Sequence, residues 1–211
     1  MIEKVSDYIV CNYLYKGENV SNEQKEIMNF GVTRIIEDIP KILVIFIISY
    51  LLKILPFLLV SIIINFIYKT FIGGAHARTN ILCLVLSTMF FIFPCLLVKF
   101  ITIPQYLLYI FYIVNLIFSG YIIIKRAPAD TEEVPILKES KRKKLRIFAS
   151  LSLGIVYILC FFVIKDIKIQ SLVMINVFLI NLNATKLIYK MLHCKTSIES
   201  EEFKDYFINK I

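Results

Sequence analysis

The sequence predicts an all-α, polytopic integral membrane protein with about six membrane segments and amphipathic helices at its N-terminus. Of its 211 residues, 58% are hydrophobic, and the mean hydropathy is +0.75. Soluble domains contain about 45–50% apolar residues, arranged in periodic stripes. Here the apolar residues form long blocks nearly free of charge, at residues 42–48, 54–64, 81–98, 106–124 and 172–182. One core cannot bury all of them, which excludes a soluble globular protein.

The charged residues lie between these blocks. There are 24 Lys and Arg against 16 Asp and Glu, a net charge of +8. In a soluble protein this balance would point to nucleic acid, but in a membrane protein it marks cytoplasmic loops that meet anionic lipid. The five cysteines are scattered without a CxxC pair, which excludes a disulfide framework and a thiolate metal cluster. The sequence therefore predicts a lipid partner and no metal, cofactor or nucleic acid.

The first 39 residues are too polar to cross a bilayer. Apolar residues at helical spacing predict an amphipathic helix over residues 2–15. Ser21 and Gln24 form a capping-box pattern for a second helix, which should end before Pro40 because the residue before a proline disfavours the helical conformation. No cleavable signal peptide is evident. We expect residues 1–39 to be interfacial helices on the cytoplasmic side.

The basic loop at residues 125–146 sets the predicted topology. It carries eight Lys and Arg, so it should be cytoplasmic. Spans at 81–98 and 104–124 form a hairpin, which places residues 69–80 on the same side. An N-terminus that stays inside then requires an even number of crossings in 42–68. Two short spans, broken around Lys53 and Pro56, satisfy this, whereas one long span is the alternative.

Two further spans are expected after the basic loop, at residues 147–164 and 169–190. They complete six segments with both termini in the cytoplasm, in a bacterial cell membrane. The transmembrane domain then covers residues 40–190, and the cytoplasmic tail at 191–211 ends in a short capped helix that begins near Ser200.

One segment, residues 71–85, is suited to chemistry. His76 lies in a polar, glycine-containing break, and Cys83 follows seven residues later. A continuous helix would hold the two side chains ~10 Å apart along its axis, too far for a nucleophile and its base, so the helix must begin between them. Thr79 and Asn80 are both good N-cap residues, Asn80 is the expected cap and could instead orient His76, and Gly73–Gly74 allows the preceding backbone to fold back.

A helix that begins at Asn80 would place Cys83 in its first turn. Free amides and the positive end of the helix dipole favour a thiolate there. The backbone amides of Ile81, Leu82 and Cys83 are candidate donors to an oxyanion. The simpler interpretation is that a histidine near a cysteine only packs helices, as Asn176, Asn181 and Asn183 are expected to do through hydrogen bonds.

Two motifs occur together in this chain. The first is Gly73–Gly74–Ala75–His76–Ala77–Arg78 with Cys83, and the second is Ala127–Pro128–Ala129–Asp130–Thr131 followed by Pro135–Ile136 and Lys141–Arg142–Lys143–Lys144. In these motifs, and in its length and order of segments, the chain resembles the accessory gene regulator protein B (AgrB) family. This chain departs from the family in having Glu132–Glu133 where basic residues often precede the proline.

The resemblance implies a membrane cysteine endopeptidase without cofactor, active as a homodimer. Such an enzyme cleaves the C-terminal tail from a quorum-sensing precursor, AgrD, and supports cyclisation to a thiolactone or lactone through a thioester. The family's catalytic pair falls on His76 and Cys83. A further expectation is that a basic cluster binds the acidic tail of the precursor; it consists of Lys141, Arg142, Lys143, Lys144 and Arg146.

Two other functions remain open on the sequence. A transporter or channel would need ionisable residues inside several spans, and the blocks at 81–98, 106–124 and 172–182 have none. A non-enzymatic membrane scaffold or sensor partner would need no nucleophile. Selective, His76-dependent labelling of Cys83 by a thiol reagent would favour the enzyme over both.

Overall fold

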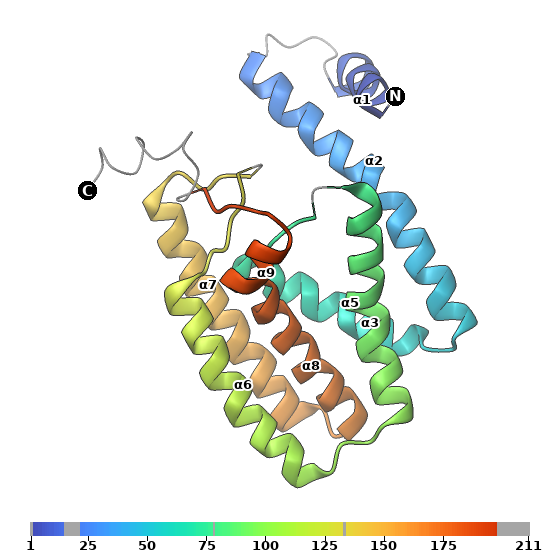
Figure 1. Cartoon of the computed structure of the whole chain (residues 1–211), viewed down its shortest axis with the longest axis vertical. Coiled ribbons are helices and arrows are strands. Elements are labelled where there is room, and N and C mark those ends of the chain that lie inside the picture. The colour runs from blue at the N-terminus through green and yellow to red at the C-terminus, as the bar shows by residue number, and fades with distance from the viewer. Residues whose placement is uncertain (1, 15–21, 78, 133, 198–211) are drawn as a thin grey trace. The chain divides into compact units, whose positions relative to one another are not determined.

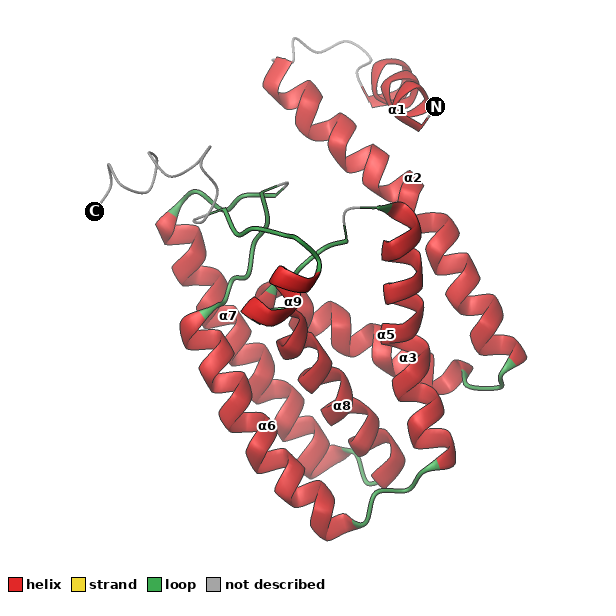
Figure 2. Ribbon diagram, in the orientation of Figure 1, coloured by secondary structure: helices red, strands yellow, loops and turns green. Residues whose placement is uncertain are grey.

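The computed structural model describes residues 2–14, 22–77, 79–132 and 134–197. Within these residues the protein is almost entirely helical, and the only extended pairings are two isolated bridges. The predicted all-α class is therefore confirmed (Figure 2). Ser21 of the predicted capping box and the helix predicted near Ser200 lie outside the described residues. The chain divides into two compact units, Met1–Leu51 and Leu52–Ile211.

The first unit contains the two predicted N-terminal helices. They are α1 (Ile2–Ile9), which continues into the π-helical turn η1 (Val10–Leu14), and α2 (Asn22–Leu51). Inside this unit the buried Ser6 hydroxyl donates to the Asn29 carbonyl at 2.9 Å. The prediction that α2 ends before Pro40 is wrong, because the helix passes through the proline to Leu51. A proline removes one backbone hydrogen bond, and the apolar segment that follows keeps its remaining amides paired by staying helical.

The second unit begins at a break in the first long apolar region. Lys53 adopts a left-handed conformation with φ of 52°, and α3 (Leu55–Ile64) starts with Pro56 in its first turn. The predicted break around Lys53 and Pro56 is thus confirmed. Helix α3 runs on through the π-helical turn η2 (Asn65–Lys69) into α4 (Thr70–Ile72), so the helical stretch Leu55–Ile72 is 18 residues long.

The remaining helices follow in chain order (Figure 1). They are α5 (Asn80–Phe100), α6 (Gln105–Lys125), α7 (Glu139–Ile158) with the π-helical turn η3 (Leu159–Val163), α8 (Ile167–Asn183) and α9 (Lys186–Met191).

Within the described residues, four helical stretches are long and apolar enough to cross a membrane. They are Leu55–Ile72, Asn80–Phe100, Gln105–Lys125 and Glu139–Val163. The polytopic class is therefore confirmed, whereas the expected number of about six segments, two of them short, is not matched exactly. Helix α8 has 17 residues, or about 26 Å at 1.5 Å per residue, against a hydrocarbon core of about 30 Å. In α2 only the C-terminal part is apolar, since Arg34, Glu37, Asp38 and Lys41 precede it.

Helix α8 is the central helix of the second unit. It packs against α3, α5 and α6, and its buried residues include Leu172, Val173, Met174 and Val177. Amide side chains tie it to its neighbours, as predicted. Asn176 Nδ2 donates to Ser61 Oγ at 3.1 Å, and Asn181 Nδ2 donates to Ser119 Oγ at 2.8 Å. The Tyr68 hydroxyl donates to Asn181 Oδ1 at 2.9 Å.

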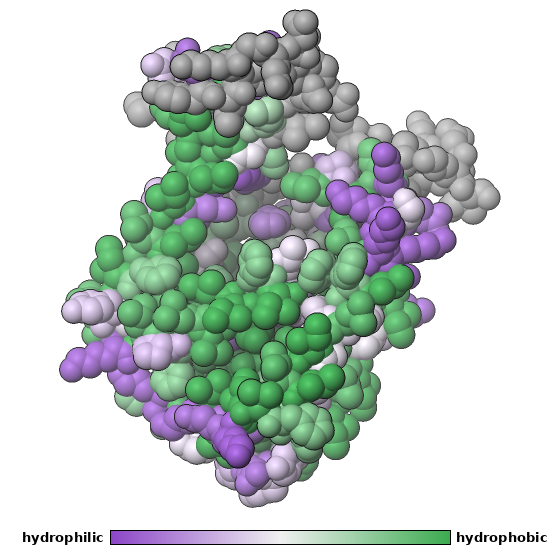
Figure 3. All heavy atoms as spheres, turned by 180° about the vertical axis from the view of Figure 1, so that it is seen from behind, coloured by the Kyte–Doolittle hydropathy of each residue, from purple (hydrophilic) through white to green (hydrophobic). Residues whose placement is uncertain are grey.

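The outside of the helices is apolar. Figure 3 shows apolar side chains over the middle of the helices, while hydrophilic side chains gather toward their ends. Exposed large side chains occur along α5, α6 and α7, for example Phe93, Ile117 and Ile155. A surface of this extent is stable only in contact with lipid or protein. Together with the four apolar helices it identifies an integral membrane protein.

Candidate functional site

The segment that carries His76 is pinned by backbone pairing to the loop between α6 and α7. Gly73 and Ala129 form a parallel bridge, in which the Ala129 amide donates to the Ile72 carbonyl at 2.7 Å and the Gly74 amide to the Ala129 carbonyl at 2.8 Å. A Cβ at Gly73 would lie 2.3 Å from the Ala129 oxygen, and Gly73 has a φ of +77°. Only glycine combines this conformation with so close an approach.

The end of α8 and the segment after α9 hold the same loop from other directions. The Ala75 amide donates to the Asn183 carbonyl at 3.2 Å, and Asn183 Nδ2 returns to the Ala75 carbonyl at 3.4 Å. The Cys194 thiol donates to the His76 carbonyl at 2.6 Å. The backbone from Ile72 to His76, whose side chain is exposed, is therefore held by residues more than 50 positions away in the sequence.

Asp130 organises the loop that receives this segment. Its buried carboxylate accepts from Arg142 Nη2 at 2.5 Å, from the Ile136 amide at 3.0 Å and from the Ser197 hydroxyl. Its carbonyl accepts from the Tyr189 hydroxyl at 3.0 Å. A buried carboxylate is stable only when it is paired in this way. Asp130 thus fixes the loop on which the His76 segment rests.

Helix α5 begins between His76 and Cys83, as the sequence argument required. The residue that caps it is Thr79, not Asn80, because the Thr79 hydroxyl accepts from the Leu82 amide at 3.3 Å. Asn80 is the first helical residue, and Cys83 is the fourth. The expected set of oxyanion donors is also corrected. The Cys83 amide donates to the Thr79 carbonyl at 2.9 Å and the Leu82 amide is taken by the cap, which leaves Ile81 as the backbone donor of that set.

The Cys83 side chain is half-buried on the first turns of α5. Its sulfur lies 4.0 Å from the Ser87 hydroxyl, one turn further along the helix. His76 is exposed, three residues before the cap. A hydrogen bond between the imidazole and the sulfur would place the His76 side chain against the first turns of α5. Catalytic hydrogen bonds are commonly loose without substrate and tighten on binding.

The basic cluster divides into two groups with different surroundings. Arg142 forms the ion pair with Asp130, and its Nε donates to the Ile136 carbonyl at 2.8 Å. Arg146 Nε donates to the Ala127 carbonyl at 3.1 Å. These two arginines brace the loop. Lys141, Lys143 and Lys144 are exposed. Lys143 pairs with Glu139 at 2.8 Å, but with about 70% of each side chain exposed (71% and 73%) this ion pair is weak.

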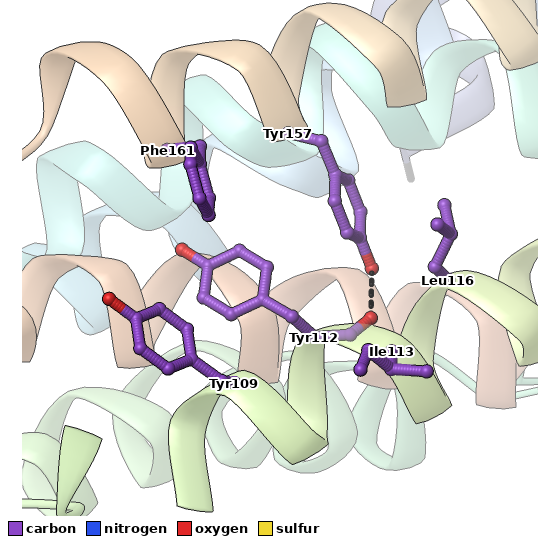
Figure 4. Close-up of a pocket in the computed structure, with 6 residues that line it drawn as sticks. All are labelled: Tyr109, Tyr112, Ile113, Leu116, Tyr157 and Phe161. Carbon is purple, nitrogen blue, oxygen red and sulfur yellow. Dashed lines mark hydrogen bonds between the residues drawn. The ribbon is translucent and has the colours of Figure 1, made fainter. Parts of the chain in front are cut away.

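A cavity of about 360 Å³ lies elsewhere in the second unit, between α6 and the α7–η3 helix (Figure 4). Its lining is aromatic and aliphatic, and the Tyr157 hydroxyl donates to the Tyr112 carbonyl at 3.2 Å beside it. Tyr109 and Phe161, at its edge, lie near the start of α6 and the end of η3, whereas Cys83 lies at the start of α5. Helices α5 and α6 form a hairpin in which the end of α5 connects to the start of α6. The start of α5, which carries Cys83, therefore lies at the opposite end of this hairpin from the start of α6, and the cavity is not part of the His76–Cys83 site. Among the described residues, no three His, Cys, Asp or Glu side chains gather into a metal site.

Sequence reasoning identified His76, Cys83 and the glycine pair, but it missed several residues that position them. Ala129, Asn183 and Cys194 contact the segment only because the helices fold together. The sequence marked Ala129 as part of a motif and Asn183 as an amide suited to join helices, but neither signal pointed to the His76 segment, and nothing marked Cys194.

Comparison with known proteins identifies the family. The family described as Accessory gene regulator B matches residues 3–188. A putative AgrB-like protein of Clostridium perfringens strain SM101 is 32% identical over 149 residues, 69% of each chain. A putative AgrB-like protein of Clostridium acetobutylicum is 25% identical over 181 residues, 85% of this chain and 80% of that protein. The accessory gene regulator protein B of Staphylococcus aureus strain MW2 is 29% identical over 154 residues, 72% of this chain and 79% of that protein. No solved structure matches the chain.

Proposed function

Because this chain belongs to the accessory gene regulator B family, with a role in the agr quorum-sensing system, we propose that it is a membrane cysteine endopeptidase. Its substrate is an AgrD-like precursor peptide, whose C-terminal tail it removes at the cytoplasmic face of the cell membrane. The observation that carries this proposal is the arrangement around residues 72–83. The backbone around an exposed histidine is clamped by distant residues, directly before a capped helix that presents a half-buried cysteine in its first turns.

The reaction is an acyl transfer. His76 removes the proton from the Cys83 thiol, and the thiolate attacks the carbonyl carbon of the scissile peptide bond. When the C–N bond breaks, His76 returns the proton to the leaving amine, and the N-terminal part of the precursor remains on Cys83 as a thioester. A nucleophilic side chain within the peptide then attacks the thioester carbonyl, releasing the Cys83 thiol and closing the ring. The thioester conserves the activation that cyclisation needs, provided that water is kept away.

The half-buried position of Cys83 supports cyclisation over hydrolysis. Its sulfur is partly shielded from solvent near the start of the apolar helix α5, which in the proposed topology lies at the membrane surface rather than in an open aqueous cleft. A transporter is not favoured, because the α5, α6 and α8 helices carry ionisable groups only near their ends, at Lys99, Lys125 and Lys168, apart from cysteines and tyrosines.

Capture of the thioester tests the proposal. The full chain in lipid vesicles is incubated with a synthetic precursor whose ring-closing residue is replaced by alanine, so that the acyl-enzyme accumulates. Mass spectrometry should find the N-terminal part of the precursor on Cys83, with loss of one water, and neutral hydroxylamine should release it. The Cys11→Ala chain, which lacks an exposed cysteine outside the site, should give the same adduct. Tail cleavage without any hydroxylamine-sensitive adduct would refute covalent catalysis by Cys83.

The exposed lysines of the basic cluster are proposed to hold the acidic tail of the precursor. Replacing Lys141, Lys143 and Lys144 by Glu should lower the rate of tail cleavage at least about tenfold, because attraction at the rim of a binding surface becomes repulsion. A precursor in which acidic tail residues are changed to Lys should recover part of the loss. Cleavage is followed by mass spectrometry of the released tail.

A charge change elsewhere serves as the control for this prediction. Lys186 and Lys190 are also exposed and lie on α9. Exposed charges outside a binding surface contribute little, so replacing these two lysines by Glu should leave the cleavage rate within about twofold of that of the unmodified chain. Normal cleavage by a correctly inserted triple variant, or an equal loss in the α9 control, would contradict tail binding by Lys141, Lys143 and Lys144.

A further inference from the structure

Lys69 is a cation placed against the same face of α5 as Cys83. It ends the π-helical turn η2, and its ammonium lies 4.9 Å from the centre of the Phe90 ring. Phe90 follows Cys83 by seven residues and Ser87 by three, so all three side chains lie on one face of the helix. Aromatic side chains on a helix lean toward its N-terminus, which brings the Phe90 ring, and the ammonium over it, toward Ser87 and Cys83.

Ser87 lies between the phenylalanine that carries the ammonium and the cysteine. Its hydroxyl is 4.0 Å from the Cys83 sulfur, and the Lys69 ammonium lies over the Phe90 ring one turn further along the helix, close enough to Cys83 for an electrostatic interaction. Both Lys69 and Cys83 are partly buried. In such a position the effective dielectric constant is lower than in water, so a charge acts more strongly on its neighbours.

No acidic side chain among the described residues forms an ion pair with this ammonium. The helices that pack against α5 in the second unit are α3 and α8. Helix α3 has no charged residue, and α8 has only Lys168, in its first turn. Asp130, the buried carboxylate of the neighbouring loop, is already paired with Arg142. A partly buried cation without an anion is costly, and the one group on this face that can become an anion is the Cys83 thiol.

We infer that Lys69 is a positioning residue of the site, the counterion that stabilises the Cys83 thiolate. The inference rests on the proposed function and adds to it a second source of cysteine activation besides His76. His76 moves the proton, whereas the Lys69 ammonium supplies a positive charge that favours the ionised sulfur before substrate binds. A lysine that only extended to the lipid headgroups would have no influence on Cys83.

The pH profile of Cys83 alkylation tests this assignment. The full chain in lipid vesicles, without precursor, is treated with iodoacetamide from pH 5.5 to 9.5, and alkylation of Cys83 is measured by mass spectrometry of its peptide. In Lys69→Met the profile should move toward higher pH, with alkylation about tenfold slower at pH 7, as expected for one unit of change in thiol ionisation. At the alkaline end the two rates should converge, which a general structural defect would not produce.

Two further variants complete the test. Lys69→Arg keeps the charge and should keep a profile close to that of the unmodified chain. Lys99→Met removes another lysine that contacts a phenylalanine ring, with its ammonium 5.4 Å from Phe100 at the far end of α5, and should change nothing. An unshifted profile in Lys69→Met, or an equal shift in Lys99→Met, would overturn the assignment. Because no precursor is present, these outcomes do not depend on whether the chain cleaves a peptide. Failure of the proposed function would appear in a different experiment, as tail cleavage that survives the loss of Cys83.

Discussion

Replacement of Cys83 by alanine should abolish tail cleavage, with a loss of at least about 10³-fold, since removing a covalent nucleophile leaves only the weak catalysis of binding. Replacement of His76 by alanine should lower the rate by about 10²–10⁴-fold, the usual contribution of a general base. Both variants should insert into the membrane normally, because neither side chain is part of the buried core. Co-expression with the precursor, followed by mass spectrometry of the tail, measures both effects.

Matched controls exist for each residue. Cys11 is a free, exposed cysteine outside the site, and Cys11→Ala should cleave at the normal rate. His193 is the second histidine and has a φ of 52°, so asparagine, which tolerates that conformation, is its appropriate replacement. His193→Asn should retain cleavage. Undiminished cleavage by Cys83→Ala would falsify the mechanism, and equal losses in the His193 and His76 variants would remove the special role of His76.

Replacement of Gly73 by alanine should lower cleavage by about tenfold to hundredfold without preventing insertion. At φ +77° and ψ −151° a residue with a Cβ is strained by about 1–3 kcal/mol, and its Cβ would lie 2.3 Å from the Ala129 oxygen. The chain relieves both by moving the segment away from Ala129. In most molecules His76 is then displaced from the position that the reaction needs. Each 1.4 kcal/mol by which the displaced conformation is favoured lowers the cleavage rate about tenfold.

Two glycines within the transmembrane helices provide the comparison. A Cβ at Gly120 or at Gly154 would meet nothing within 4 Å, and neither glycine has a left-handed φ. Gly120→Ala and Gly154→Ala should therefore cleave normally and be present in the membrane at normal levels. If Gly73→Ala cleaved as well as these two variants, the backbone pairing with Ala129 would not position His76.

The membrane class, the helix break at Lys53–Pro56 and the candidate pair His76 and Cys83 could be predicted from the sequence, since each depends on residues near one another in the chain. Long apolar blocks require helices in lipid, and the break at Lys53–Pro56 follows from local backbone preferences. The polar segment between two apolar blocks likewise marks His76 and Cys83, because a helix must begin between them. The local rule failed at Pro40, where the helix continues into an apolar segment.

Only the tertiary structure decided what holds the site together. Ala129, Asn183 and Cys194 reach the His76 segment from far along the chain, and Arg142 proved to be bound to Asp130 rather than available for a peptide. The place of α8 at the centre of the second unit also depends on its packing against α3, α5 and α6. Periodicity and spacing report on residues within one helix, whereas contacts between helices depend on how side chains pack after the chain has folded, so a single sequence does not contain them in readable form.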